Sequence, residues 1–175
     1  MLIKYHFADH CDSTQLWAHD RLHELSPNII NKFSAIKQTH GQGTHGKTWL
    51  SPPGGYYTSF SWLTLNWLDS ELSVDLANMI SKALKQYGID AYVKPPNDIF
   101  IDQKKVAGHL IEQEQVGQFV AVVIGIGINI DSTVSTTQPT TSLSQWANIT
   151  MTDIDQSIDQ IIWGLFLRSN HLVQC

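Results

Sequence analysis

Residues 41–49 read GQGTHGKTW, a glycine-rich loop with the spacing of a phosphate-binding site. Gly41, Gly43 and Gly46 fit the dinucleotide fingerprint G-x-G-x-x-G, and the stretch up to Thr48 fits the P-loop pattern G-x-x-x-x-G-K-S/T. In both motifs, the backbone N–H groups of the loop and the positive end of the next helix hold the phosphate. A helix directly after the loop is therefore part of either motif.

The residues that follow the loop argue against both motifs. Residues 52–55 read PPGG, and two prolines with two glycines leave no room for a helix. One feature keeps a weak P-loop case open, because Asp131 follows an apolar segment, as a magnesium-binding aspartate of a P-loop protein would. The glycines that interrupt this segment and the missing helix count against it. A glycine loop that joins two strands is the remaining interpretation, and such a loop on its own is as readily a surface turn as a binding site.

The chain has 175 residues, of which 42% are hydrophobic and 15% are charged, and its formal net charge is −5. This length and composition predict a single folded domain over residues 1–175. The acidic balance gives no reason to expect nucleic-acid binding. No window approaches the roughly 20 apolar residues that cross a membrane, so we expect no membrane partner.

Cysteine and histidine usage predicts a reduced chain without a metal site. Cys11 and Cys175 lie at opposite ends of the chain without pairing or metal-ligand spacing, which favours a cytoplasmic location. His19 and His23 lie four positions apart on one predicted helix face, but no third ligand accompanies them. We therefore expect no protein-bound metal.

Hydrophobic periodicity and turn residues predict an α+β domain. Strands are expected at residues 2–7, 32–38, 56–65, 91–94, 97–102, 105–114 and 119–130, and helices at 14–25, 70–87 and 152–172. Asp12 or Ser13 is expected to cap the first helix, Thr152 or Asp153 the last, and residues 102–104 to form a hairpin turn. Consecutive strands joined by short turns favour a mixed, mainly antiparallel sheet with helices packed on one side.

Four segments, in order, resemble the catalytic domain of biotin protein ligases. Asp12-Ser13-Thr14-Gln15 is similar to the family's D-S-T-N, and residues 38–55 to Q-x-x-G-R-G-R-x-G-R-x-W-x-S-P-x-G. KPPNDIFIDQKKVAGHLIE at 94–112 resembles K-W-P-N-D followed by K-x-x-G-I-L-x-E, and VIGIGINI at 123–130 resembles G-x-G-x-N. Each segment alone is weakly specific, but four in this order and spacing are a strong signal.

The resemblance implies a fold related to class II aminoacyl-tRNA synthetases, the biotin synthetase-like type. It also implies a two-step reaction, in which biotin and Mg·ATP give biotinyl-5′-AMP and a lysine of a biotin carboxyl carrier domain then accepts the biotin. The implied substrates are biotin and ATP, with Mg²⁺ as the activating ion. Homodimers occur through this domain in the family. Residues 1–175 are expected to contain neither an N-terminal helix-turn-helix domain nor a C-terminal β-barrel domain.

The resemblance also assigns roles to individual residues. Catalytic roles are implied for Lys105, Asp98 and Asn97. Biotin binding is implied for Ser13, Thr14, Gln38, Gly41, Gln42, Lys105, Gly108, Leu110 and Gly125. Nucleotide binding is implied for Thr44, Lys47, Trp49, Asn97 and Asn129.

The residue types suit this chemistry. A ureido ring has two N–H donors and one strong acceptor, which the hydroxyls of Ser13 and Thr14 and the amide of Gln38 complement. A lysine at position 105 would neutralise the two anions that must approach each other. Gly125 and Gly127 remove side chains where a bicyclic ring would lie flat on a strand. Without the resemblance, Ser13 is equally a helix cap and Lys105 a solvated lysine of a hairpin.

The departures from the family pattern lie in the loop and beside the biotin floor. The family's loop is rich in arginines, which grip phosphate with a planar fork of donors, whereas this loop carries Gln42, Thr44 and His45 and keeps only Lys47, which stands at the third arginine position of the pattern. We therefore predict that the adenylate is held loosely. Pro95 replaces a tryptophan, Gln15 an asparagine and His109 an isoleucine, and the polar ring of His109 is expected to face the ligand.

Two alternatives share the fold. A lipoate or octanoate ligase or transferase would modify a lysine with an acid that lacks the ureido group. A non-catalytic biotin-binding relative would keep the pocket without the reaction.

Overall fold

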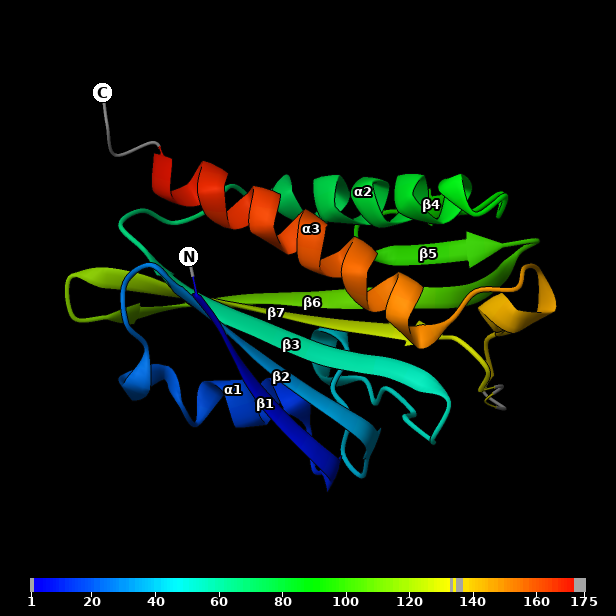
Figure 1. Ribbon diagram of the computed structural model, residues 1–175, viewed down its shortest axis with the longest axis horizontal. Coiled ribbons are helices and arrows are strands. Elements are labelled where there is room, and N and C mark those ends of the chain that lie inside the picture. Colours follow the sequence, from blue (N-terminus) through cyan, green and yellow to red (C-terminus); the bar gives the residue numbers. More distant parts are fainter. Residues whose placement is uncertain (1, 133, 135–136, 172–175) are drawn as a thin grey trace.

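The computed structural model describes residues 2–132, 134 and 137–171. A seven-stranded sheet in the order β1-β2-β3-β7-β6-β5-β4 forms its centre (Figure 1). The strands are β1 (Leu2–Cys11), β2 (Ile29–Gln38), β3 (Gly55–Thr64), β4 (Tyr92–Lys94), β5 (Asp98–Ile101), β6 (Lys104–Val116) and β7 (Phe119–Asn129). The helices are α1 (Thr14–His19), α2 (Leu72–Gln86) and α3 (Met151–His171), with 3₁₀ turns η1 (Leu22–Glu24), η2 (Thr44–Gly46) and η3 (Leu143–Gln145). Only β1 and β2 pair in parallel among these strands, so the predicted mixed, mainly antiparallel sheet is confirmed.

The helices cover both faces of the sheet (Figure 1). Leu76 and Ile80 of α2 belong to the same buried cluster as Ile124 of β7. Ala18 of α1 belongs to a second cluster, which contains the adjacent Val123. Because successive residues of a strand point to opposite faces, α1 lies on the face opposite α2 and α3. The expectation of helices on one side holds for α2 and α3 and is wrong for α1.

The first helix is shorter and the first strand longer than predicted. The Ser13 hydroxyl accepts hydrogen bonds from the N–H groups of Gln15 and Leu16, which confirms Ser13 as the cap of α1. β1 continues to Cys11, because it pairs with β2 as far as the partners Cys11 and Gln38. This pairing places the start of α1 beside the end of β2.

The predicted turn between β5 and β6 is confirmed. Asp102 and Gln103 have φ values of 45° and 60°, as a tight two-residue hairpin requires. The predicted cap of the last helix is wrong, because Thr150 caps α3. The Thr150 hydroxyl accepts from the N–H of Asp153 (3.2 Å), and the carboxylate of Asp153 accepts from the N–H of Thr150 (2.8 Å).

A buried lysine ties α3 to the sheet. The side chain of Lys32 on β2 is 3% exposed, and its Nζ lies 2.6 Å from Asp155 and 2.7 Å from Asp159 of α3. No helix within the described ranges is both long and apolar enough to cross a membrane.

Candidate active site

A cavity of about 480 Å³ opens on the α1 side of the sheet, within the roughly 300–1,000 Å³ typical of small-molecule sites. Its lining comes from the start of α1, the end of β2, the glycine loop, β6 and β7. Most of the predicted site residues line it, namely Ser13, Thr14, Gln38, Gln42, Thr44, Lys47, Trp49, Asn97, Lys105, Gly108, Leu110, Gly125 and Asn129. The structure thus brings together residues from all four motif segments.

Two predicted residues lie outside this lining. Asp98 stands behind it, with its Oδ1 2.6 Å from Lys105 Nζ. Gly41 borders a neighbouring cavity of about 400 Å³, and its biotin contact stays a prediction. A Cβ at Gly41 would lie 2.4 Å from the carbonyl oxygen of Trp49. Glycine is therefore required there by the close approach of the two sides of the loop.

Hydroxyl and amide groups gather beside Gly125 and form one part of the lining, the polar wall, which we define as Thr14, Gln38 and Ser59. The backbone N–H of Thr14 donates to Gln38 Oε1 (2.8 Å), and the Thr14 hydroxyl lies 2.9 Å from the Ser59 hydroxyl. Gln38 Nε2 donates to Ser51 (2.7 Å), which fixes the orientation of its amide. Sequence reasoning missed Ser59, and its only signal was a polar residue inside the predicted strand 56–65.

A cation lies at the other part of the lining, near Gly108. Lys105 Nζ contacts Asp98 and lies 5.0 Å from the centre of a Trp49 ring, within cation–π range. A Cβ at Gly108 would approach Trp49 to 3.1 Å and Lys105 to 3.3 Å, so this glycine leaves room for both. Asn97 is anchored to β6, because its Nδ2 donates to the carbonyl oxygen of His109 (2.9 Å).

Side chains cover the two glycines of β7 that were predicted to leave the strand open. A Cβ at Gly127 would lie 2.5 Å from Trp49, and one at Gly125 would lie 2.4 Å from Gln15 Oε1. Trp49 and Gln15 therefore occupy the strand surface that a flat ring was expected to use. Asn129, at the end of β7, donates to the carbonyl oxygen of Thr141 (3.1 Å) and so ties the strand to the segment that follows it.

The glycine loop is a hairpin. Gly43 N–H donates to the carbonyl oxygen of Lys47 (2.7 Å) and Trp49 N–H to that of Gly41 (2.8 Å). The 3₁₀ turn η2 closes it, with His45 at φ 57° and Gly46 at φ 71°. The next element is β3, not a helix, which confirms that neither phosphate motif applies.

His109 is among the residues that border the cavity, but its ring is directed toward α2. It contacts the Ser73 hydroxyl of α2 through Nε2 (3.0 Å), on the opposite face of the sheet from α1. Burial, with a smaller contribution from the charge of Lys105, lowers the pKa of His109 to about 4. The expectation that this ring meets the ligand is wrong, and His109 is neutral near pH 7.

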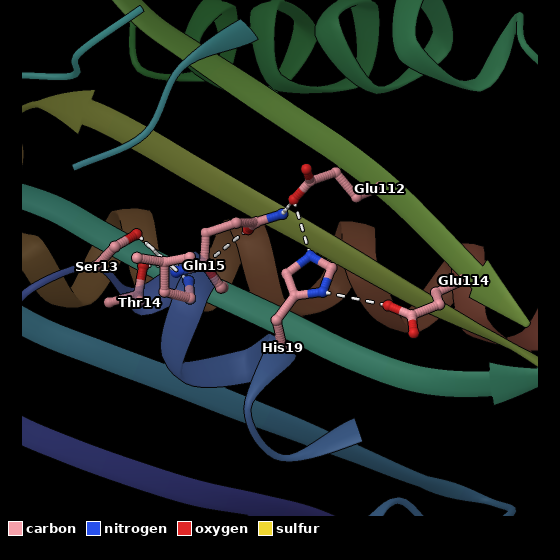
Figure 2. A network of polar contacts seen from close by, with 8 residues as sticks. Ser13, Thr14, Gln15, His19, Glu112 and Glu114 are labelled. Atoms are coloured by element: carbon pink, nitrogen blue, oxygen red, sulfur yellow. Dashed lines mark hydrogen bonds and ion pairs between the residues drawn. The ribbon is translucent and has the colours of Figure 1, made fainter. Parts of the chain in front are cut away.

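A charged network lies behind the polar wall (Figure 2). Gln15 Nε2 (2.7 Å) and His19 Nε2 (2.9 Å) both contact Glu112 Oε2, and His19 Nδ1 lies 3.8 Å from Glu114. The hydrogen bond with Glu112 raises the pKa of His19, and the hydrogen bond from His19 lowers the pKa of Glu112. His19 is thus an ion-pair partner in this structure. Across residues 2–132, 134 and 137–171, no three His, Cys, Asp or Glu side chains gather as a metal site.

The fold and the cavity define a class of α+β domains that carry a small-molecule site on one face of a mixed sheet. A model of the Biotin/lipoate A/B protein ligase family matches residues 10–129. The chain belongs to this family.

The relatives agree with this assignment. The bifunctional ligase/repressor BirA of Escherichia coli is 33% identical over 124 residues, which cover 68% of this chain and 38% of BirA. The chain therefore spans well under half of that relative's length. Biotin protein ligase from Aquifex aeolicus, in complex with biotin and ATP, has a TM-score of 0.71 at 26% identity, over 93% of this chain and 70% of that one. The Leishmania major enzyme with biotin has a TM-score of 0.73 at 24% identity, over 94% and 73%, and shows the shared fold.

Proposed function

We propose that this chain is the catalytic domain of an ATP-dependent biotin–protein ligase. A carboxylate oxygen of biotin attacks the α-phosphorus of ATP, the bond to the bridging oxygen breaks, and biotinyl-5′-AMP and pyrophosphate form. The amine of a lysine in a biotin carboxyl carrier domain then attacks the carbonyl carbon of the mixed anhydride. An amide bond forms, AMP leaves and the amine loses a proton.

The distribution of polar groups along the cavity is the observation that carries this proposal. The polar wall beside Gly125 offers hydroxyls and an amide to a ureido ring. Lys105 lies further along, beside Gly108, where the carboxylate of the same ligand would point. One cavity therefore complements both polar ends of biotin.

Lys105 is placed to lower the barrier of the first step. The carboxylate and the α-phosphate are both anionic, and an ammonium between them stabilises the charge that develops as they approach. Asp98 holds this ammonium at 2.6 Å and is the carboxylate available to position or deprotonate the acceptor amine. The nucleotide side of the cavity is formed by Thr44, Lys47, Trp49, Asn97 and Asn129.

Magnesium enters this proposal with ATP. Mg²⁺ is usually held through substrate phosphates and waters, with few protein ligands, so the site requires no cage of side chains. The carrier domain as acceptor, a homodimer, a cytoplasmic location and the single-domain organisation stay predictions.

The polar wall distinguishes biotin from the alternative acids. Lipoyl and octanoyl chains carry no ureido group, so they would leave the buried hydroxyls of Thr14 and Ser59 without a ligand partner, which weakens binding. A non-catalytic biotin-binding relative would have no need for the Lys105–Asp98 pair.

The test is a competition for activation. The purified chain, Mg²⁺ and ATP are incubated with equal concentrations of biotin, lipoate and octanoate, and the acyl-adenylates are identified by mass spectrometry. We expect biotinyl-5′-AMP as the main product. Lipoyl- or octanoyl-AMP as the main product would support the second candidate, and biotin binding without any adenylate would support the third.

A further inference from the structure

The hydroxyls of the polar wall have their hydrogens committed to protein acceptors. Ser59 donates its single hydroxyl hydrogen to Gln15 Oε1 (3.0 Å). The Thr14 hydroxyl has two acceptors within reach, Ser59 Oγ at 2.9 Å and Gln38 Oε1 at 3.1 Å. Neither hydrogen points into the cavity, so lone pairs of both oxygens face it.

Glu112 determines this direction. A carboxylate only accepts hydrogen bonds, so Gln15 must turn its Nε2 toward Glu112 (2.7 Å) and its Oε1 toward Ser59. The opposite orientation of the amide would set its carbonyl oxygen against the carboxylate. The Gln15 side chain is buried, and its Oε1 lies against Gly125, so the amide has little room to move away.

His19 holds Glu112 in this arrangement. Its Nε2 contacts the same carboxylate oxygen as Gln15 does, as the converging contacts in Figure 2 show. The charged groups that face His19 are Glu112 at 2.9 Å, Glu114 at 3.8 Å and the neighbouring Asp20. The hydrogen bond from His19 lowers the pKa of Glu112 further below neutrality, so Glu112 is an anion and therefore an acceptor at neutral pH.

We propose that Glu112, held by His19, is a positioning residue that orders the hydrogen bonds from Thr14 through Ser59 and Gln15, so that the polar wall presents acceptors and selects a ligand with N–H donors. This inference rests on the proposed function, because the ureido N–H groups of biotin are the donors in question. It adds a source of specificity outside the cavity lining.

The direct test removes the charge without changing the shape. In Glu112→Gln, an amide at position 112 can either accept from or donate to Gln15, so the Gln15 amide is free to reverse and the Ser59 hydrogen to turn toward the cavity. The probes are biotin and its cyclic carbamate analogue, in which a ring oxygen replaces one ureido N–H. Dissociation constants for both are measured by calorimetry without ATP.

The readout is the ratio of the two dissociation constants. In the native chain the ring oxygen would face a lone pair, so we expect the carbamate to bind about 30-fold more weakly than biotin, as for a mismatched buried polar pair. In Glu112→Gln the ratio should fall below about fivefold, because the hydroxyl can reorient to donate. A change in packing alone would weaken both ligands and leave the ratio unchanged.

Two further variants complete the experiment. His19→Gln should lower the ratio by a smaller amount, because Glu112 keeps its charge but loses its partner. Glu114→Gln is the matched control, since Glu114 lies on the same strand, contacts His19 only at 3.8 Å and does not contact Gln15, and its ratio should equal that of the native chain. Thermal unfolding checks that each variant is folded.

The outcomes separate the two proposals. Equal ratios in the native chain and a folded Glu112→Gln variant would overturn the role of Glu112 and leave the biotin ligase proposal intact. Failure of the native chain to bind biotin would overturn the proposed function and this inference with it.

Discussion

Both sides of the sheet hold a lysine against carboxylates, and one of these lysines, Lys105, lines the active-site cavity. Lys32 is 3% exposed and contacts both Asp155 and Asp159 of α3. The Lys105 side chain is 18% exposed and contacts Asp98 at 2.6 Å, the same distance as the shorter Lys32 contact. The lengths of the ion pairs therefore do not distinguish a structural lysine from a catalytic one.

The number of counter-charges and the neighbouring space distinguish them. Two carboxylates neutralise Lys32 beneath a helix, so no further anion has access to it. Within the described residues, Lys105 has one carboxylate partner and lines the cavity, so it can take a second anion from a ligand. A lysine that has a single carboxylate partner and lines a cavity is therefore the feature to associate with chemistry.

The largest expected effect comes from Lys105→Ala. Adenylate formation should fall about a thousandfold, since this removes the main cation from the developing charge. The unfolding free energy should change little. Lys104→Ala is the matched control, because Lys104 is the adjacent residue of β6 but does not line the cavity. Rates are compared by quenched-flow detection of the adenylate, and equal losses in both variants would contradict the distinction.

Lys32→Met should show the reverse pattern. Removing one partner of a buried ion pair leaves two aspartates without a counter-charge, and we expect a loss of about 3 kcal/mol, at the low end for such pairs because the aspartates can partly rehydrate. Urea unfolding measures this. Adding Asp155→Asn and Asp159→Asn should recover most of the loss, and no recovery would show that packing, not charge, is responsible.

His109 extends the comparison to a second buried group on the face that α2 and α3 cover. Its pKa is about 4 in the folded chain, against a usual value near 6.5, so the unfolded chain binds the proton first as the pH falls. Stability is therefore lost between these two pKa values, by about 2 kcal/mol from pH 7.5 to pH 5. His109→Leu should remove this part of the pH dependence of urea unfolding. An unchanged pH dependence would contradict the burial of a neutral ring.

Thr44→Arg should give the smallest effect, on the cavity side. Thr44 lines the cavity in η2, at a position where the family pattern has an arginine. A new charged hydrogen bond to the phosphate should slow release of the adenylate about tenfold. Release is followed by rapid dilution of the preformed complex. A release rate no slower than that of the native chain would contradict the prediction of a loosely held adenylate.

The sequence predicted the strands and the site where local pattern carries the information. Turn residues such as Asp102-Gln103 and the apolar run of β7 identify elements, because a tight hairpin and a strand buried on both faces each demand particular residue types. The four motif segments could be recognised from their glycines and polar residues, and each of them supplies residues that line the cavity.

The parts that the sequence could not predict depend on long-range pairing. In the buried centre of β6, alternation does not reveal which residues face which side, so the direction of the His109 ring followed only from its partner Ser73 on α2. Glu112 and Gln15 are far apart in the chain, and their contact depends on how α1 lies over β6. β1 continued to Cys11 for the same reason, through pairing with β2.

Biotin-dependent exchange of radiolabelled pyrophosphate into ATP tests the central claim most directly, because it reports the first step without an acceptor protein. With the purified chain and Mg²⁺, we predict exchange that requires biotin, is abolished in Lys105→Ala and persists in Lys104→Ala. Binding of biotin without any exchange in the native chain would contradict the account, because the cavity would then hold the ligand without activating it.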